Sequence, residues 1–544
     1  MININQEKTN LALIIFFFVF INLFFLHSID GPDLWFHLQI GQENLINKTI
    51  SQADFHSFTA EGQKYINQSW LAQIVFFSIY KILGIFGLQL FHSVILFSIF
   101  ILLFLSSKSS KTPTSLIALI FLLPLAFIHD QIRPFIFTWF FSSLIIFLLS
   151  KKKYYPLPIV FLLWVNLHAG FLLGLGVIFF YLLIESISSK KIEPLLFFLL
   201  SFIATLINPS GIKVYSYPFS INDSIKLLSI SEWQPFEVGT IYFWIYLIFI
   251  LTIIVLSIKQ KVYRTNLLEF IFIICFSLFG FTSMRQSAPI VIFLFPLFVK
   301  YTSKALSSLK KIFIPIISCL VLLILFFSLK IPQRLDNGLG VDNLILPVYG
   351  IDFIKEHQIT GNIFNDITYG GIMIFKQPEK KIFIDGRLEI YQGKPVKEYG
   401  IVSVGAFGWQ QILEKYNIDC IFIERNSLNL NKTLINNPQW DLVYFDTTSV
   451  IYLKKGTYLN VPRLKYINPY DFNLPTNIDP FIEEYKYLTI KNPRFYQGYG
   501  ILASSYIQKK DYLIAKYYLT KFLDIAPDKS DPEIKRMKNL LNIK

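Results

Sequence analysis

Long apolar runs, repeated through the first 330 residues, constrain the fold of this chain more than any other feature. A helix needs roughly 20 apolar residues to cross a bilayer. Several of the runs are shorter than that, so some ends must be tilted or buried in protein. Composition agrees, because 53% of the residues are hydrophobic and 16% are charged, whereas a soluble domain carries about 25% charged residues. We therefore expect a mostly α-helical, polytopic transmembrane bundle of about eleven spans. We place the spans at residues 11–29, 88–106, 114–129, 135–150, 156–168, 170–187, 193–208, 241–258, 267–284, 286–302 and 312–330.

The lysines and arginines between the runs set the expected orientation. A further apolar run, 70–87, is ambiguous: if it also crossed the membrane, the basic clusters would face outside, against the usual preference of such loops for the cytoplasm. We therefore expect 70–87 to lie along the membrane interface, which suits Gln73, Ser78 and Lys81 on an otherwise apolar helix. The basic clusters then all face the cytoplasm, at 108–111, 151–153, 190–191, 259–264 and 304–311.

This arrangement of spans also predicts the location of the protein. The +14 net charge is explained by cytoplasmic loops rather than by a nucleic-acid-binding face. No small-residue cleavage site follows the first run, so we expect an uncleaved first span. We expect a multi-pass protein of a bacterial inner membrane, with the C-terminal region on the periplasmic or extracellular side.

Beyond residue 330 the composition changes, and we expect two external regions. Residues 331–470 read as a small α/β domain with helices near 347–358 and 407–417. Its expected strands are Gly361–Asn365, Lys381–Arg387, Asp419–Ile423 and a hairpin of Asp441–Phe445 with Ser449–Leu453. We expect residues 471–544 to form a helical segment resembling one tetratricopeptide (TPR) unit, which should pack on helices near 480–490 and 532–543 or on a partner. The positions that fit the repeat are Tyr499, Leu502, Ala503, Tyr506, Ala515, Leu519 and Pro527.

Unusual polar residues gather on the external side of the domain formed by residues 1–330. Two long loops, about 30–69 and 209–240, carry many of them, and short turns between spans carry the rest. Intramembrane and juxtamembrane polar groups are costly to keep, so their gathering on one side predicts a cavity there.

The first external loop supplies the candidate catalytic residues Asp33, His37 and Asp54. Asp33, His37 and Gly41 are four residues apart and share one face of a helix that starts near Pro32. A carboxylate at the rim of an apolar bundle is a candidate base, although Asp33 could instead cap the helix, as we expect of Asp30. For His37 and Asp54 a functional and a purely structural role are equally compatible with the sequence.

The other external turns supply candidate substrate-binding residues. Arg133 and Arg285 stand at external helix ends, where a guanidinium can bind phosphate or simply reach toward the interface. Two arginines on this side run against the usual charge distribution, which favours phosphate binding. Polar turn residues and aromatic surfaces near them would face the same cavity, namely Trp70, Asn166, His168, Glu232 and Trp233.

Cofactor signatures are missing from the sequence. Three scattered cysteines, Cys275, Cys319 and Cys420, give neither a disulfide framework nor a cysteine-based zinc site. No phosphate-binding glycine loop or dinucleotide fingerprint occurs. A divalent metal has no support from the sequence, so we assign no metal ligands. Any sugar donor would be a lipid phosphate reached from the bilayer.

The chain resembles the GT-C superfamily of polytopic glycosyltransferases, and more narrowly a group of bacterial membrane proteins similar to mannosyltransferases that use polyprenyl-phosphate sugars. Many relatives carry an Asp-Glu pair in the first loop, whereas this chain has Asp33-Leu34. The superfamily resemblance rests on Asp33, Gly41 and Trp70-Leu71. The narrower one rests on Asp33-Leu34-Trp35-Phe36-His37, Arg133-Pro134, Asn166-Leu167-His168, Asn208-Pro209, Glu232-Trp233 and Phe383-Ile384-Asp385-Gly386-Arg387.

The resemblance implies inverting transfer of a hexose from a polyprenyl-phosphate donor. Asp33 would act as general base toward an extracytoplasmic acceptor, and Arg133 and Arg285 would stabilise the departing phosphate. The implied partners are membrane lipid, the lipid-linked sugar and a glycan, lipid or protein acceptor, with no nucleic acid.

A non-catalytic membrane scaffold is the alternative function. It would bind a protein partner through the external TPR-like segment, but it leaves the polar residues of 1–330 unexplained. A transporter would carry charged residues at mid-span, which are nearly absent from the sequence.

Overall fold

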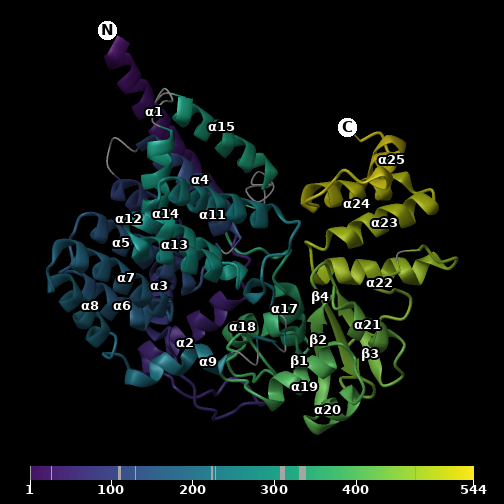
Figure 1. Cartoon of the computed structure of the whole chain (residues 1–544). Coiled ribbons are helices and arrows are strands. Elements are labelled where there is room, and N and C mark those ends of the chain that lie inside the picture. Colours follow the sequence, from purple (N-terminus) through teal and green to yellow (C-terminus); the bar gives the residue numbers. More distant parts are fainter. Residues whose placement is uncertain are drawn as a thin grey trace. The chain divides into compact units, whose positions relative to one another are not determined.

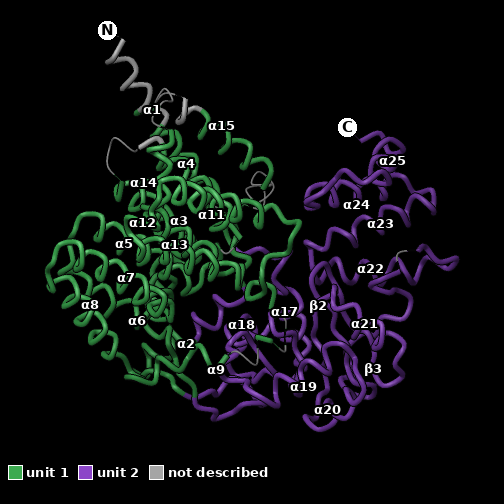
Figure 2. The backbone as a smooth tube through the Cα atoms, viewed as in Figure 1, with its two compact units in different colours: residues 1–31, 40–52, 65–340 green, residues 32–39, 53–64, 341–544 purple. Residues whose placement is uncertain are grey.

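The computed structural model describes residues 2–25, 27–107, 112–128, 130–221, 225–226, 228, 230–306, 313–329, 338–471 and 473–543. Within these residues the chain forms two compact units, drawn in different colours in Figure 2. Unit 1 comprises residues 1–31, 40–52 and 65–340, and unit 2 comprises residues 32–39, 53–64 and 341–544. The division therefore assigns two segments of the expected first external loop to the same unit as the C-terminal region.

Unit 1 is a bundle of apolar helices (Figure 1). Helices occur at each of the eleven runs expected to span the membrane, because these runs are predominantly apolar. The helices at these runs are α1 (Ile2–Asn22), α3 (Trp70–Ser106), α4 (Thr112–Phe127), α5 (Phe135–Ser150), α6 (Leu157–Leu167), α7 (Phe171–Ser189), α8 (Glu193–Ala204), α11 (Ile241–Lys259), α13 (Leu267–Phe279), α14 (Ser287–Ala305) and α15 (Phe313–Ser328).

Shorter elements complete unit 1 at the helix ends. They are η1 (Leu23–Phe25), η3 (Gly211–Ser216), α9 (Tyr217–Ser220), η4 (Ser231–Trp233), α12 (Val262–Thr265) and η5 (Met284–Gln286). Helix α2 (Asp33–Asn47) contributes residues to both units.

Apolar helices long enough to cross a membrane are present among the described residues, judged by length and composition. Four qualify, at Trp70–Ser106, Phe171–Ser189, Ile241–Lys259 and Met284–Ala305, and seven shorter apolar helices accompany them. The number of crossings and their direction stay predictions. Of the residues used to predict orientation, Lys108, Lys111, Lys310 and Lys311 lie outside the described residues.

Helix α14 is the most enclosed of the four long apolar helices. In its most apolar stretch 72% of the residues are buried, against 28% in α11. It packs against α4, α5 and α11, so it occupies the middle of the bundle. A residue placed just before α14 is therefore held by a rigid and well-packed element.

The ambiguous run at 70–87 belongs to helix α3, which bends at Gly84. Gly84 has φ 63° and ψ −157°, a conformation that glycine adopts without a steric penalty. The helix therefore consists of two segments that meet at this residue, as the sequence suggested, with the junction at 84 rather than at 87. The position of the first segment at the interface stays a prediction.

Unit 2 contains a four-stranded sheet with the order β1-β2-β4-β3. Its strands are β1 (Asn362–Asn365), β2 (Ile418–Glu424), β3 (Trp440–Phe445) and β4 (Ser449–Lys454). Strand β1 pairs in parallel with β2, for example Phe364 with Ile421, and β4 runs antiparallel to both β2 and β3. The expected hairpin is thus present as β3 and β4. The helices on this sheet are α17 (Val348–Glu356), α18 (Ile367–Lys376), α19 (Lys394–Ser403), α20 (Trp409–Lys415) and α21 (Leu428–Ile435).

The expected strand at Lys381–Arg387 is wrong. Ile382 forms an isolated bridge with Ser57, and the remainder of the segment has no sheet partner. Its backbone bonds go to the first-loop segment, from Phe58 N–H to Ile382 carbonyl at 3.1 Å and from Ile382 N–H to His56 carbonyl at 2.9 Å. The apolar run is buried, as a strand would be, but a loop distant in sequence satisfies its polar backbone groups.

The C-terminal helices are α22 (Ile478–Lys491), α23 (Tyr496–Gln508), α24 (Tyr512–Ile525) and α25 (Pro532–Leu540). Helix α23 packs on both α22 and α24, and the Ser504 hydroxyl donates to Met537 Sδ of α25 at 3.3 Å. The packing expected from the repeat-like pattern is therefore present. The identification of a TPR unit stays a prediction.

Candidate functional site

Two buried charged clusters contain or adjoin most of the candidate site residues, one in each unit. The arginine cluster, in unit 1, consists of Arg133, Phe135, Glu232, Trp233 and Arg285. Arg285 Nη1 donates to Glu232 Oε1 at 2.6 Å, and Arg133 donates to both oxygens of the same carboxylate through Nη1 and Nη2. The three charged side chains are only 11–16% exposed. A shared carboxylate therefore orders two guanidiniums in one place.

Local structure brings the two arginines to this carboxylate. Pro134 immediately precedes α5, a position that suits the fixed φ of proline, and Arg133 comes just before it. Arg285 lies in η5, which leads into the enclosed helix α14. The loop that carries Glu232 is tied to η5, because Met284 N–H donates to Gln234 carbonyl at 2.9 Å.

Aromatic rings cover the guanidinium of Arg285. Its Cζ lies 4.4 Å from the centre of the Phe135 ring and 4.7 Å from that of Trp233. Such stacking is favourable for the flat, weakly hydrated guanidinium and limits its movement. The ring of His168 also contacts the Phe135 ring edge to face, with the ring centroids 5.4 Å apart. His168 is therefore connected to the arginine cluster through Phe135.

Trp70 and Asn166 form a neighbouring pair. Trp70 Nε1 donates to Asn166 Oδ1 at 2.9 Å, and Asn166 Nδ2 donates to the carbonyls of Leu162 and Ile207. His168 Nδ1 accepts from Gly170 N–H at 3.0 Å and lies 2.7 Å from the Thr138 hydroxyl. All seven predicted substrate-binding residues thus lie in unit 1. Five of them form or adjoin the arginine cluster, whereas Trp70 and Asn166 form a separate hydrogen-bonded pair whose contacts also support the structure.

The predicted catalytic residues lie in unit 2. Asp33 is the first residue of α2, so Asp33, His37 and Gly41 share a helix as expected. A Cβ atom added to Gly386 would lie 2.5 Å from Asp33 Oδ1, so the carboxylate sits directly over the Gly386 backbone. Asp33 is partly exposed and His37 is buried beside the Phe36 ring.

A buried ion cluster lies in the same loop as Gly386. Arg387 Nη2 bonds to Asp385 Oδ2 at 2.6 Å and to Asp54 Oδ1 at 2.9 Å. Asp54 also accepts from the backbone N–H and the hydroxyl of Ser57, and the Tyr391 hydroxyl donates to Asp385 at 3.2 Å. Both carboxylates are completely buried. The predicted residue Asp54 therefore fixes the tail loop against the first-loop segment.

Glu389 completes this second group, which we call the carboxylate cluster: Asp33, Asp54, Asp385, Arg387 and Glu389. Burial raises the pKa of Glu389 to about 7, Arg387 opposes that shift, and the negative charges of Asp385 and Asp33 add to it. A carboxyl group with such a pKa changes its charge near neutral pH.

Sequence reasoning missed Asp385, Arg387 and Glu389 as site residues. The sequence feature that could have indicated them is the charged stretch Asp385-Gly386-Arg387, which directly follows an apolar run. This stretch was interpreted only as part of the motif that carries the family resemblance. Charged residues that directly follow a buried run must find partners, and here the partners come from the first loop.

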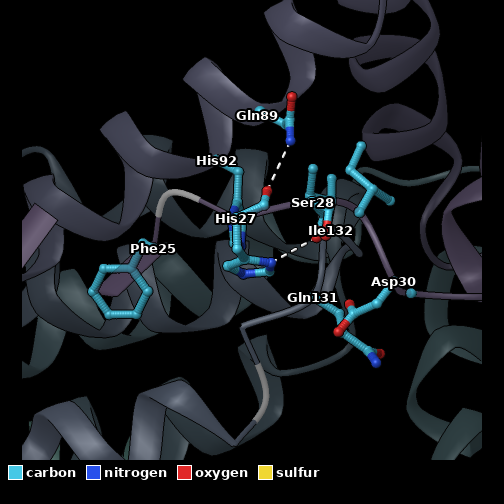
Figure 3. Close-up of a pocket in the computed structure, with 10 residues that line it drawn as sticks. Phe25, His27, Ser28, Asp30, Gln89, His92, Gln131 and Ile132 are labelled. Carbon is cyan, nitrogen blue, oxygen red and sulfur yellow. Dashed lines mark hydrogen bonds between the residues drawn. The ribbon is translucent and has the colours of Figure 1, made fainter. Parts of the chain in front are cut away.

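A small pocket in unit 1 was also not anticipated (Figure 3). His27, Gln89, His92 and Asp30 are among its lining residues. The His27 ring lies between the Ser28 carbonyl, 2.6 Å from Nδ1, and Asp130 Oδ2, 2.9 Å from Nε2, so both ring nitrogens face oxygen atoms. Gln89 Nε2 donates to the His27 carbonyl at 2.7 Å. These contacts tie His27 to Asp130 and to Gln89 of α3.

Metal coordination has no candidate among the described ranges, where no group of three or more His, Cys, Asp or Glu side chains could hold a metal ion. The chemistry that the two clusters suit is different for each. Paired guanidiniums beside an aromatic surface suit an anion such as a phosphate, and a partly exposed carboxylate among other acids suits proton abstraction.

Comparison with known proteins gives few matches. No family model and no curated protein matches the chain. Among solved structures, ArnT from Cupriavidus metallidurans in the apo state is similar, with a TM-score of 0.47, 10% identity and coverage of 83% of this chain and 98% of that one. The same protein bound to undecaprenyl phosphate gives a TM-score of 0.39, 11% identity and coverage of 84% and 98%. The similarity extends over most of both chains.

Proposed function

We propose that this chain is a membrane glycosyltransferase that moves a sugar from a polyprenyl-phosphate donor to an acceptor outside the cytoplasm. The observation that carries the proposal is the arginine cluster, in which Arg133 and Arg285 are ordered around Glu232 at the ends of apolar helices. A lipid phosphate presents an anion at the depth where such helices end.

The donor chemistry matches the cluster in two respects. Guanidiniums form paired hydrogen bonds to phosphate oxygens, and these bonds strengthen where water is partly excluded. Trp233 supplies a flat apolar surface of the kind that packs against a sugar ring. An ion pair kept only for stability is a poor explanation, because replacing buried charges with apolar residues is often neutral or stabilising.

Asp33 is the proposed general base. It would take the proton from the acceptor hydroxyl as that oxygen bonds to the anomeric carbon, and the bond from this carbon to the phosphate oxygen would break with its electrons leaving on the phosphate. Arg133 and Arg285 would stabilise the charge that develops there. Attack opposite to the leaving phosphate inverts the anomeric centre. We assign Asp54 to positioning, because its oxygens are committed to Arg387 and Ser57.

The remaining predicted residues are proposed to shape the donor site. His168 supports the Phe135 ring beneath Arg285, and the Trp70–Asn166 bond holds α3 next to α6. His37 lies one turn beyond Asp33 on α2 and would hold the acceptor side in place. The proposed location is a bacterial inner membrane with unit 2 outside the cytoplasm.

The direct test is transfer by the purified full chain, reconstituted in lipid with radiolabelled polyprenyl-phosphate sugars and an envelope extract as acceptor. Asp33→Asn should lower transfer about 10²- to 10⁴-fold, the usual contribution of a general base, without loss of folding. Asp479→Asn, an exposed change on α22 of the same unit, is the matched control. Normal transfer by Asp33→Asn would remove the assigned base.

A cellular test addresses the whole proposal. Mass analysis of cell-envelope glycans should show a missing or truncated glycan when the encoding gene is deleted, restored by the native chain and not by Asp33→Asn. An unchanged glycan profile would count against the enzyme.

One observation favours the alternative function, a membrane scaffold. Leu513 and Tyr517 on α24 are 82% and 57% exposed, one turn apart, and would suit a protein partner. Truncation at residue 480 is a poor test, because α22 carries the fully buried Tyr485. Paired Leu513→Ser and Tyr517→Ser changes are cleaner: the scaffold predicts loss of function from these changes and none from Asp33→Asn, and the transferase predicts the reverse.

A further inference from the structure

We propose that the tail loop, residues 384–390, positions the general base of the transferase, with Gly386 making room for the Asp33 carboxylate and Glu389 altering the basicity of that carboxylate. This inference rests on the proposed function. It makes the C-terminal unit part of the catalytic machinery rather than an appended domain, and it gives roles to residues about 350 positions from the base in sequence.

A side chain at Gly386 would force the Asp33 carboxylate to move. An added Cβ would meet Asp33 Oδ1 at 2.5 Å and Phe36 Cε1 at 3.5 Å. Contacts below 3.0 Å essentially never occur at real Cβ atoms. Gly386 does not have a positive φ, so a substitution here would act through its contact with the Asp33 side chain rather than through backbone conformation. The missing Cβ of Gly386 therefore leaves room for the Asp33 carboxylate above the loop.

Helix α18 closes the same arrangement from another side. A Cβ on Gly371 would lie 2.8 Å from Pro32 carbonyl, and a Cβ on Gly370 would lie 2.2 Å from Ile384 carbonyl. Two adjacent glycines thus let α18 touch both the start of α2 and the tail loop. The three backbones approach each other more closely than any side chain would allow, which fixes the position of Asp33.

The loop itself is rigid because its charges are paired. Arg387 bonds to Asp385 and Asp54, and the Phe36 ring lies 5.9 Å from the Arg387 guanidinium. The Leu388 N–H donates to Gly386 carbonyl at 3.0 Å and the Ile390 N–H to Arg387 carbonyl at 2.9 Å, forming a tight turn. Glu389 lies within this turn, so its carboxyl group is carried by a fixed backbone.

Glu389 can alter the basicity of Asp33 through charge. The groups that act on it are Asp33 from α2 and Asp385 and Arg387 from its own loop, and burial raises its pKa to about 7. Asp54 and Tyr391 also face Asp385 and Arg387. When Glu389 is ionised, its negative charge makes Asp33 a stronger base, and when it is protonated that effect is lost. Transfer should therefore rise with pH through a midpoint near 7.

The first experiment measures kcat/KM against pH for the full chain in lipid. Glu389→Gln should abolish the rise of kcat/KM near pH 7, so that the rate stays at its low-pH value. Glu414→Gln, a change at an exposed position on α20, should keep the pH profile of the native chain. A merely structural role for Glu389 would change the rate without changing the profile. Retention of the native profile by Glu389→Gln would overturn the inference.

The second experiment compares two glycines. Gly386→Ala should displace the Asp33 carboxylate and lower kcat by about 10²-fold with little change in KM for the donor, the scale expected for a misplacement of about 1 Å. Gly400→Ala is the matched control, because nothing lies within 4 Å of its added Cβ and its φ is not positive. Native hydrogen exchange in both variants would show that folding is intact. Equal activity of the two variants would contradict the assigned role of Gly386.

The outcomes separate this inference from the proposed function. A native chain without transfer activity at any pH would remove the transferase and the inference with it. An active native chain that is inactivated by Asp33→Asn but indifferent to Gly386→Ala and Glu389→Gln would leave the transferase standing and remove only the role of the tail loop.

Discussion

The arginine cluster of unit 1 and the carboxylate cluster of unit 2 are both charged and largely buried, yet they are built in opposite ways. In the first, two guanidiniums share one carboxylate and aromatic rings cover Arg285. In the second, the Arg387 guanidinium is shared by two carboxylates, with Glu389 and Asp33 nearby. A cation-rich cluster suits a phosphate and an anion-rich cluster suits a proton.

The two clusters also differ in what keeps them in place. Helix ends and short 3₁₀ turns hold the arginines, so their positions follow from the packing of apolar helices. Asp54 and Asp385 are held by Arg387, and close approach of backbones at Gly370 and Gly371 brings the tail loop and the start of α2 to α18. We therefore expect substitutions in unit 1 to act mainly on donor binding, and substitutions in unit 2 to act on stability and proton transfer. The following predictions test that contrast, starting with the largest effect.

Loss of the shared cation should be costly in unit 2. Arg387→Met would leave the fully buried Asp54 and Asp385 without that guanidinium, and removing one partner of a buried pair costs about 3–5 kcal/mol. Arg133→Met should cost less, because Glu232 keeps Arg285. Hydrogen exchange of residues 53–64 and 380–392, compared with exchange around 231–236, measures both. Similar losses in the two variants would remove the contrast.

Substitution of Arg285 in the arginine cluster should have the next largest effect. Arg285→Met should lower kcat/KM about 10²-fold, as removal of one donor to a developing oxyanion does, and should weaken binding of undecaprenyl phosphate. Arg264→Met changes an exposed arginine on α12 and should leave transfer unaltered. Titration with the lipid phosphate and initial rates give the two quantities. Unchanged lipid binding in Arg285→Met would separate the arginine cluster from the donor.

Tight packing at α18 should give a smaller effect. Gly371→Ala inserts a methyl group 2.8 Å from Pro32 carbonyl, and overpacking of this kind costs about 1–3 kcal/mol. Exchange should increase together in 32–39 and in α18, since both belong to unit 2. Gly400→Ala again serves as control. Faster exchange in α18 alone would show that the first-loop segment is held by other contacts.

The pH dependence of stability should show the smallest effect. The pKa of Glu389 is raised from 4.5 to about 7 in the folded chain, so its stabilising contribution is complete below pH 4.5 and is lost as the pH rises to about 7. Because the side chain is partly exposed, we expect about 1–2 kcal/mol. Thermal unfolding at pH 4.5 and 8 should show a weaker pH dependence for Glu389→Gln than for the native chain. An identical dependence would contradict the assignment.

Sequence reasoning located several elements correctly where the signal was local. The apolar runs became helices, and the residues before Asp446 and after Thr448 became a hairpin, because hydrophobic pattern and turn residues act over a few positions. The strand expected at Lys381–Arg387 failed for the opposite reason. Burial alone does not distinguish a strand from an extended loop when the hydrogen-bonding partner, here around His56 and Phe58, is more than 300 residues away.

By itself the sequence determined which segments prefer lipid and which charged side chains stand at their ends, because transfer of a short segment from water depends on its own residues. The tertiary structure decided which charges share a site. Asp54 meets Arg387, and Asp33 lies over Gly386, through contacts between distant parts of the chain. Such contacts depend on how close segments distant in sequence come to one another, and that distance is set only when the whole unit is packed.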